Sequence, residues 1–574
     1  MPKSLHDIRY SVMVIGTIQG ALLLLAHELI VRKIWPGTSL PFMVAWYTAI
    51  IGAPAAVQLL MVKPQDRRPW AYASALSLVL IAVGAYFGAT IDPDHARGLY
   101  FVFGLTVAVA WFVALPFAAI WIKTGRWRFS YPDLFTYAWN NTLTLAIAGL
   151  FTGTFWLLLW LWASLFKVIG IQFFSELFTQ RMFIYLVTGV VFGFAVSLGR
   201  TYEWAVVTVR NVVLSTLRGL LPLLTGIALL FLLALPFTGL QPLWNTGHAA
   251  ALMLTLQLLF ILFLNATYQD GRDKAPYVSW LRRGVELAAI TLPIYSILSL
   301  YAIGLRVNQY GWSDDRVWAM LIATISACYA TGYAATALAR RPRWLPWVGP
   351  VNVAMAAVVI AVMILANSPV LDPKRIAVHS QIQRLLSGRV SAEAFDYRYL
   401  RFDSGKPGLD GLIRLASLTE HSQAKVIRDK AKSALAVRNR WEEQAAGGPA
   451  EVISRIEVLP RGKTLDPGLA AFLFEKKALS NFYCGYRERC LMLAVDLNND
   501  GREEYMFLEY PNSIFSFQDN GWREVGKIAS NSKHYRSPRD HKELLNAGKY
   551  KIVSSKWPNL QIGEDLYVVV EGDQ

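Results

Sequence analysis

Long apolar runs separated by short polar segments occupy the first two thirds of the chain. A helix of about 18 or more apolar residues is long enough to cross the ~30 Å hydrocarbon core of a bilayer. Eleven runs approach or exceed this length, at residues 11–30, 40–61, 70–89, 98–122, 139–166, 182–199, 218–239, 248–267, 285–304, 317–338 and 348–367. The pattern predicts a polytopic α-helical membrane bundle over residues 1–370.

Two segments beside these runs mix aromatic, charged and apolar residues. They cover residues 127–139 and 201–216. Helices of such mixed composition lie in the membrane interface. We therefore expect the first to open the fifth span as an interfacial helix, and the second to lie on the membrane surface.

The pattern changes after residue 370, where the chain becomes polar. Helical periodicity continues over residues 371–446, and Gly447-Gly448-Pro449 marks a boundary. Beyond it, short alternating runs predict strands at 452–458, 489–495, 504–510, 514–518, 522–528 and 566–570. One helix is expected from Pro467, with Asp466 as its N-cap. The tail therefore predicts a helical collar, residues 371–446, and a soluble α+β domain, residues 447–574.

The charge of the chain follows the same division. The net charge is +16 over 574 residues, but residues 1–370 hold 25 Lys and Arg against 13 Asp and Glu, while the tail is nearly balanced. A basic excess among membrane spans sets their orientation. No nucleic-acid-binding motif accompanies it, so we expect the bilayer, and not nucleic acid, as the partner of this region.

The positive charges also alternate from loop to loop. If the N-terminus is cytoplasmic, the inside segments carry 18 Lys and Arg and the outside loops carry 7. This bias is the one that the positive-inside rule describes. An odd number of spans then places the collar and the α+β domain in the periplasm.

The segment AVDLNNDGREEYMF, between two predicted strands, resembles a calcium loop. Hard oxygen ligands at alternate positions, followed by a glycine that permits the turn, suit Ca²⁺. An EF-hand is excluded because Phe507 stands where its last glutamate would be. The predicted metal residues are Asp496, Asn498, Asp500, Arg502 and Glu504. The alternative is a plain hairpin turn, which Asn-Asp-Gly also favours.

Two cysteines, Cys484 and Cys490, precede this loop. In an oxidising compartment such a pair can form a disulfide, which the periplasmic placement favours. The alternative is two free thiols, if the tail is cytoplasmic. A zinc site is not expected because no histidine lies nearby.

The membrane half offers few groups for chemistry. Charged residues gather in the outer loop LRVNQYGWSDDRVW and at span ends, where charge is tolerated. No Walker, Gly-x-Ser-x-Gly or His-Glu-x-x-His motif is present. A multispan glycosyltransferase would need acidic residues in its first outer loop, which is basic here apart from Glu28 at its edge.

The outer-loop stretch NQYGWSDDRVWA places Tyr310, Gly311, Ser313, Asp315 and Arg316 in one short motif. This motif resembles a signature of a bacterial family of polytopic membrane proteins, domain-of-unknown-function family 4153. The stretch FDYRYLRFDSGKPGLDGLIRLA, residues 395–416, is similar to the segment that follows the spans in proteobacterial members. The resemblance implies a bacterial inner-membrane location and no particular activity.

These observations predict a non-enzymatic envelope scaffold, sensor or accessory subunit whose periplasmic domain binds a protein or glycan. The first alternative is a transporter or a flippase for lipid-linked substrates. The second is a membrane glycosyltransferase.

Overall fold

The structure is a computed structural model, and it divides the chain into two compact units, Met1–Ala431 and Lys432–Gln574. The residues it describes are 3–91, 97–271, 276–339, 344–437, 454, 456–475, 490–508, 513–518, 521–527, 542–547, 549, 560–562 and 565–567. Helices of the predicted collar up to residue 431 fall within the first unit. The placement of collar and α+β domain on the periplasmic side stays a prediction.

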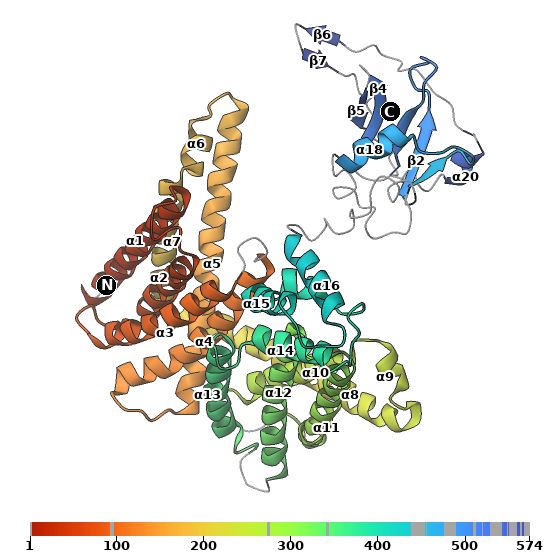
Figure 1. Ribbon diagram of the computed structural model, residues 1–574. Helices are drawn as coiled ribbons and strands as arrows, with labels where there is room; N and C mark the ends of the chain where they lie inside the picture. The colour runs from red at the N-terminus through yellow and green to blue at the C-terminus, as the bar shows by residue number, and fades with distance from the viewer. Residues whose placement is uncertain are drawn as a thin grey trace. The chain divides into compact units, whose positions relative to one another are not determined.

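The first unit is built of helices (Figure 1). In chain order they are α1 (Lys3–Val31), α2 (Leu40–Leu60), α3 (Arg68–Thr90), α4 (Arg97–Thr124), α5 (Tyr131–Val168), α6 (Phe173–Thr179), α7 (Arg181–Thr201), α8 (Glu203–Thr238), α9 (Gln241–Asn245), α10 (Ala249–Tyr268), α11 (Ser279–Tyr310), α12 (Asp314–Leu338) and α13 (Val348–Ala366). Among the described residues, 11 helices are long and apolar enough to cross a membrane. The predicted polytopic helical fold is therefore confirmed.

The first predicted interfacial segment lies from Tyr131 onward at the start of the fifth span, where we expect it, and belongs to α5, which runs unbroken over 38 residues. The second, expected as a separate surface helix, merges into α8, which runs over 36 residues. At 1.5 Å per residue these helices are about 57 and 54 Å long. No proline or glycine lies within residues 133–148 or 203–218, so nothing interrupts the backbone hydrogen bonds there. The prediction of a separate surface helix at 201–216 is wrong.

Small residues let α1 and α7 approach closely. Gly16 and Gly20 on α1 face Gly189 and Gly193 on α7, each pair four residues apart. A Cβ added at Gly16 would lie 2.3 Å from the carbonyl oxygen of Gly189. Paired glycines at this spacing are a common helix–helix interface in membranes, because backbones can touch directly.

Buried amides also join the helices of the bundle. The Gln257 side chain of α10 donates to the carbonyl of Leu292 at 3.1 Å and to the hydroxyl of Ser296, both on α11. Its Oε1 accepts a hydrogen bond from Ser326 of α12 at 2.7 Å. Such interhelical bonds contribute roughly 0.6–2 kcal/mol each in membranes.

The collar helices follow α13. They are α14 (Pro373–Leu386), a π-helical turn η2 (Tyr399–Asp403), α15 (Gly405–Ala416) and α16 (Ala424–Ala436). α14 packs against α12, and α15 packs against α3. Asp372 caps α14, because its Oδ1 accepts the N–H groups of Lys374 at 2.9 Å and Arg375 at 3.4 Å. The collar helices of this unit therefore lie on the membrane bundle and not apart from it.

The second unit contains a five-stranded sheet in the order β1-β2-β3-β4-β5. Its strands are β1 (Ile456–Leu459), β2 (Cys490–Val495), β3 (Glu504–Phe507), β4 (Ser513–Gln518) and β5 (Gly521–Lys527). β1 pairs with β2 in parallel, and the other neighbours are antiparallel. Further described elements are α18 (Pro467–Glu475), α20 (Lys542–Asn546), β6 (Leu560–Ile562) and β7 (Asp565–Tyr567). The predicted α+β fold of the tail is confirmed.

Helix α18 covers one face of this sheet. Leu469 and Leu473 are fully buried against Phe507 and Phe515. The predicted N-cap is present, since Asp466 Oδ1 accepts the N–H of Leu469 at 3.0 Å. The predicted cap therefore fixes the start of the helix that completes the core of this unit.

Candidate functional site

The loop between α11 and α12 forms the centre of the site, and its shape depends on one glycine. Gly311 directly follows α11 with a φ of +76°. A Cβ there would lie 2.5 Å from Cδ of Arg384 in the collar. Glycine adopts this conformation without steric cost and leaves room for the arginine. The loop therefore turns sharply, and α12 begins at Asp314.

Two arginines converge on Tyr310 beside this turn. Arg316 donates from Nη1 to the carbonyl of Gly311 at 2.7 Å, and its guanidinium carbon lies 5.5 Å from the centroid of the Tyr310 ring. Arg306, one turn earlier in α11, lies 6.0 Å from the same centroid. These are cation–π distances. The structure thus brings three of the predicted motif residues together and adds Arg306 to them.

The two aspartates that open α12 have different surroundings. The predicted motif residue Asp315 is exposed. In Asp314, by contrast, Oδ1 is buried and has no hydrogen-bond partner in the described part of the chain. The N–H of Asp314 donates to the hydroxyl of Tyr399 in the collar at 3.2 Å. Asp314, which the motif assignment did not include, is therefore the acidic residue enclosed by the fold.

Collar side chains hold the loop through its backbone. Gln381 donates from Nε2 to the carbonyls of Tyr310 at 3.0 Å and Trp312 at 2.7 Å. Ser380 accepts the N–H of Trp312 at 3.2 Å. We call the contact of Ser380, Gln381, Arg384 and Tyr399 with loop residues 308–314 the collar joint.

Arg384 completes the collar joint. Its Nη1 and Nη2 donate to the carbonyls of Asn308 at 3.2 Å and Gln309 at 2.7 Å. Both of these bonds are exposed to solvent, so each contributes less than the roughly 1.5–3 kcal/mol of a hydrogen bond to a charged group. Together with the Tyr399 contact, six hydrogen bonds attach the collar to this loop.

A cavity of about 50 Å³ beside the collar joint contains the ends of buried charged groups, among them Asp314, Asp372 and Lys374. The Nζ of Lys374 is buried and makes no hydrogen bond to any residue that the structure describes. Burial lowers the pKa of Lys374, and the carboxylates of Asp314, Asp372 and Asp403 oppose that shift. Tyr86 of α3 donates to Asp372 at 2.6 Å. The lysine therefore neutralises acids that the fold has removed from water.

A larger cavity of about 960 Å³ lies among α4, α10, α11 and α12. Arg306, Asp315 and Arg316 border it, together with His248 at the start of α10. The remaining lining is mostly apolar. Val102 and Trp318 line both cavities, so the two lie next to each other, with Asp314 on the small cavity and Asp315 and Arg316 on the large one.

Sequence reasoning missed Asp372, Lys374 and Arg384. A signal existed for Asp372, because Asp followed by Pro is typical of a helix start. None existed for Lys374 or Arg384, because Asp314 lies 60 positions before Lys374 and the carbonyls that Arg384 binds lie 75 and 76 positions earlier. Their roles depend on how the collar folds back on the bundle.

The predicted metal loop joins β2 to β3. Asp496 accepts the N–H groups of Asp500 at 3.2 Å and Gly501 at 2.9 Å. Glu504 is buried and accepts from the N–H of Leu497 at 2.8 Å and the hydroxyl of Ser516 at 3.0 Å. No group of three His, Cys, Asp or Glu that could hold a metal was found in the part of the chain that the structure describes.

Other predicted members of this loop also bind within it. Asn498 donates to Asp500 Oδ2 at 2.9 Å, and the N–H of Arg502 donates to Asp500 Oδ1 at 2.8 Å. The Arg502 guanidinium lies 5.0 Å from the centroid of the Phe517 ring. The loop is therefore a tight turn between strands, and Ca²⁺ binding stays a prediction.

Calcium binding predicts a metal-dependent stability of the second unit. A ligand present at 100 times its dissociation constant stabilises a fold by about 2.7 kcal/mol. We expect added Ca²⁺ to raise the melting temperature of the full-length protein, and Asp500→Ala to abolish the increase. Asp410→Ala, an exposed acid of α15, is the control. Melting curves that are identical in Ca²⁺ and EGTA would exclude the site.

Of the two predicted disulfide residues, Cys490 is buried at the start of β2. Cys484 lies outside the described residues. The disulfide therefore stays a prediction.

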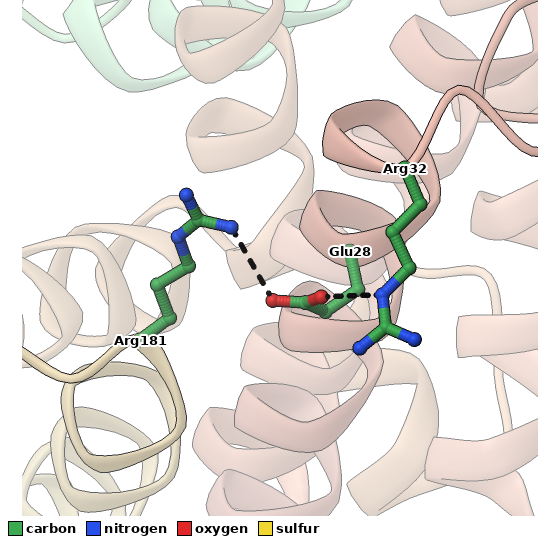
Figure 2. Close-up of polar contacts among 3 residues, drawn as sticks. All are labelled: Glu28, Arg32 and Arg181. Atoms are coloured by element: carbon green, nitrogen blue, oxygen red, sulfur yellow. Dashed lines mark hydrogen bonds and ion pairs between the residues drawn. The ribbon is translucent and has the colours of Figure 1, made fainter.

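Glu28, at the end of α1, is bound between two arginines (Figure 2). Its Oε2 accepts from Nε of Arg32 at 3.0 Å, and its Oε1 lies 3.6 Å from Nη1 of Arg181. Both carboxylate oxygens are thus engaged, and the ion pair with Arg181 joins α1 to α7. This arrangement fits a structural role better than that of a catalytic base, which needs an oxygen directed at a substrate.

The fold and the collar joint define a class: multispan helical membrane proteins in which the chain after the last span folds back onto one loop of the bundle. A family model described as "Domain of unknown function (DUF4153)" matches residues 53–415. The chain belongs to this family, which confirms the resemblance. The matched residues include both sides of the collar joint and end before the second unit. No curated protein and no solved structure matches the chain significantly.

Proposed function

We propose that this protein is a non-enzymatic scaffold, sensor or accessory subunit of the bacterial inner membrane. Its second unit lies in the periplasm and binds a periplasmic protein or a glycan. The supporting observation is the collar joint, in which six hydrogen bonds attach the collar to the loop between two spans. Because the collar precedes the second unit in the chain, a fixed collar gives that unit an anchored start.

The polar groups within the bundle favour this function over the alternatives. In the described spans, the buried polar side chains are Gln, Asn, Ser and Thr. Several of them bind the backbone or side chains of neighbouring helices, as Gln257 does, which is a stabilising role. The glycosyltransferase alternative is weakened because Glu28 is engaged by Arg32 and Arg181.

Affinity purification of the full-length protein tests the scaffold function. After cross-linking in native membranes, we expect quantitative mass spectrometry to find one or a few envelope proteins in amounts comparable to the protein itself. The matched control is a chain ending after residue 437, which should lose this partner while its bundle still accumulates. If the full-length chain retains no such protein or glycan, the scaffold function is excluded.

A charge-conserving substitution distinguishes this function from transport. Asp315 is exposed, and its side chain makes no hydrogen bond within the part of the chain that the structure describes. A scaffold predicts that Asp315→Glu changes stability by less than about 0.5 kcal/mol and leaves partner capture intact. A transporter whose substrate contacts this carboxylate would lose uptake or flipping in the same variant while the protein still accumulates. That outcome would favour the transporter or flippase alternative.

The orientation has its own test. We propose a cytoplasmic N-terminus and a periplasmic tail, supported by the loop charges, which number 18 on one side and 7 on the other. Alkaline phosphatase fused after Ser368 should be active, and green fluorescent protein fused there should be dark. The reverse pattern would place the tail in the cytoplasm and remove the basis for both the Cys484–Cys490 disulfide and the Ca²⁺ site.

A further inference from the structure

The cavity of about 960 Å³ has an uneven distribution of polarity. Its charged residues stand at one end, on the last turns of α11 and the first turn of α12, and His248 precedes α10 at the same end. The cavity then follows α10 inward past Leu254 to Leu258, ten residues from His248 and about 15 Å along the helix axis. A long apolar chamber with one polar mouth matches an amphiphile.

The net charge at the polar end of the cavity indicates which lipid headgroup binds there. Arg306 and Arg316 both lie on the ring of Tyr310, at 6.0 and 5.5 Å from its centroid. Two cations held on one ring repel each other, and a phosphate between them relieves that repulsion. Asp315 is the acid in this lining, which leaves the mouth with a net charge of +1 when His248 is neutral.

We propose that this cavity binds an anionic phospholipid, with the phosphate on Arg306 and Arg316 and one acyl chain along α10 and α12. The volume lies within the range of about 300–1,000 Å³ that is typical of ligand sites. The walls offer apolar side chains, including Ile303, Ala319 and Ile322, which suit a hydrocarbon chain. The printed lining comes from the first unit, and Gln309 is the residue that it shares with the collar joint, so lipid binding can be tested separately from the scaffold function.

Lipid binding by the full-length protein in detergent tests the site. Native mass spectrometry gives the apparent dissociation constant for the first bound phosphatidylglycerol and for phosphatidylcholine with the same acyl chains. We expect phosphatidylglycerol to bind at least tenfold more tightly. Equal affinities for the two lipids would overturn the proposal.

Three variants locate the binding. Arg306→Gln/Arg316→Gln should weaken the binding of phosphatidylglycerol at least tenfold, so that its dissociation constant approaches that of phosphatidylcholine. Arg306→Gln alone leaves the hydrogen bond from Arg316 to the Gly311 carbonyl in place. We expect this variant to bind phosphatidylglycerol several-fold more weakly, and that loss does not depend on an altered loop. Ala319→Phe, which fills the apolar part of the cavity, should weaken the binding of both lipids. A chain in which Ala319→Phe has no effect does not bind lipid here.

The control removes the same charge elsewhere. Arg32→Gln/Arg181→Gln takes two partly exposed arginines from outside the cavity and should change affinity less than twofold. An equal loss in this variant would mean that only the general surface charge attracts the lipid. Asp315→Asn should strengthen phosphatidylglycerol binding a few-fold; weaker binding would show that the carboxylate receives a headgroup amine and would refute an anionic ligand.

Discussion

Gly16→Leu should largely abolish accumulation of the folded protein in the membrane. The added Cβ alone would lie 2.3 Å from the carbonyl oxygen of Gly189 and 3.3 Å from Cα of Gly193, all of it backbone. Backbone cannot rotate away as a side chain can, so α1 and α7 must separate along their contact. We expect a loss of about 3 kcal/mol or more, at the upper end of the range for overpacking.

The same interface allows a graded series. Gly16→Ala should destabilise less than Gly16→Leu, and Gly20→Leu should act similarly to Gly16→Leu, because its Cβ would lie 2.3 Å from the carbonyl of Tyr185. Gly153→Leu on α5 is the matched control, since a Cβ there has nothing within 4 Å. Membrane accumulation and the unfolding midpoint in denaturing detergent measure the effect. A Gly16→Leu protein with the wild-type midpoint would mean that α1 and α7 are not in backbone contact.

Lys374→Met should destabilise the attachment of the collar, because the carboxylates around the lysine remain buried without a compensating charge. The loss should stay below the roughly 3–5 kcal/mol that breaking a hydrogen-bonded buried ion pair costs, since Lys374 Nζ has no hydrogen-bond partner among the described residues. The lysine interacts with the carboxylates of Asp314, Asp372 and Asp403, and Asp314 Oδ1 has no hydrogen bond within the described part of the chain. The melting temperature and the rate of proteolysis in the collar measure the change.

A second substitution separates charge from packing. Lys374→Met/Asp314→Asn should recover most of the lost stability, because replacing both buried charges together is often close to neutral. Lys406→Met removes an exposed lysine of α15 and should change little. If the double variant is less stable than Lys374→Met alone, the lysine does not act through Asp314.

Local patterns made most of the fold predictable. Each span is defined by its own apolar residues, so the 11 spans could be placed without any knowledge of their neighbours. The sheet was readable for a similar reason: Asp519-Asn520-Gly521 signals a hairpin, and β4 and β5 do pair across it. The surface helix expected at 201–216 failed because composition does not show whether a helix stops, and no breaker stands between it and the seventh span.

The contacts between distant segments were not predictable. The spacing of Gly16 and Gly20 was visible, but nothing in the sequence names α7 as the partner. Similarly, the motif suggested Asp315 as its acid, whereas burial selects Asp314, one position earlier. The two adjacent aspartates differ in exposure because Asp314 lies in the small cavity formed by α3, α4 and the collar, whereas Asp315 borders the large cavity.

All six hydrogen bonds of the collar joint end on main-chain atoms of residues 308–314. The collar thus recognises the course of the loop and not the chemistry of its side chains. Mutations at Asn308, Gln309 or Trp312 can accumulate over generations without loosening this attachment. Gly311 is the exception, because it sets the course itself. Homologous chains can therefore differ in the side chains of this loop, and so in what its surface binds. The attachment of the collar is retained in all of them.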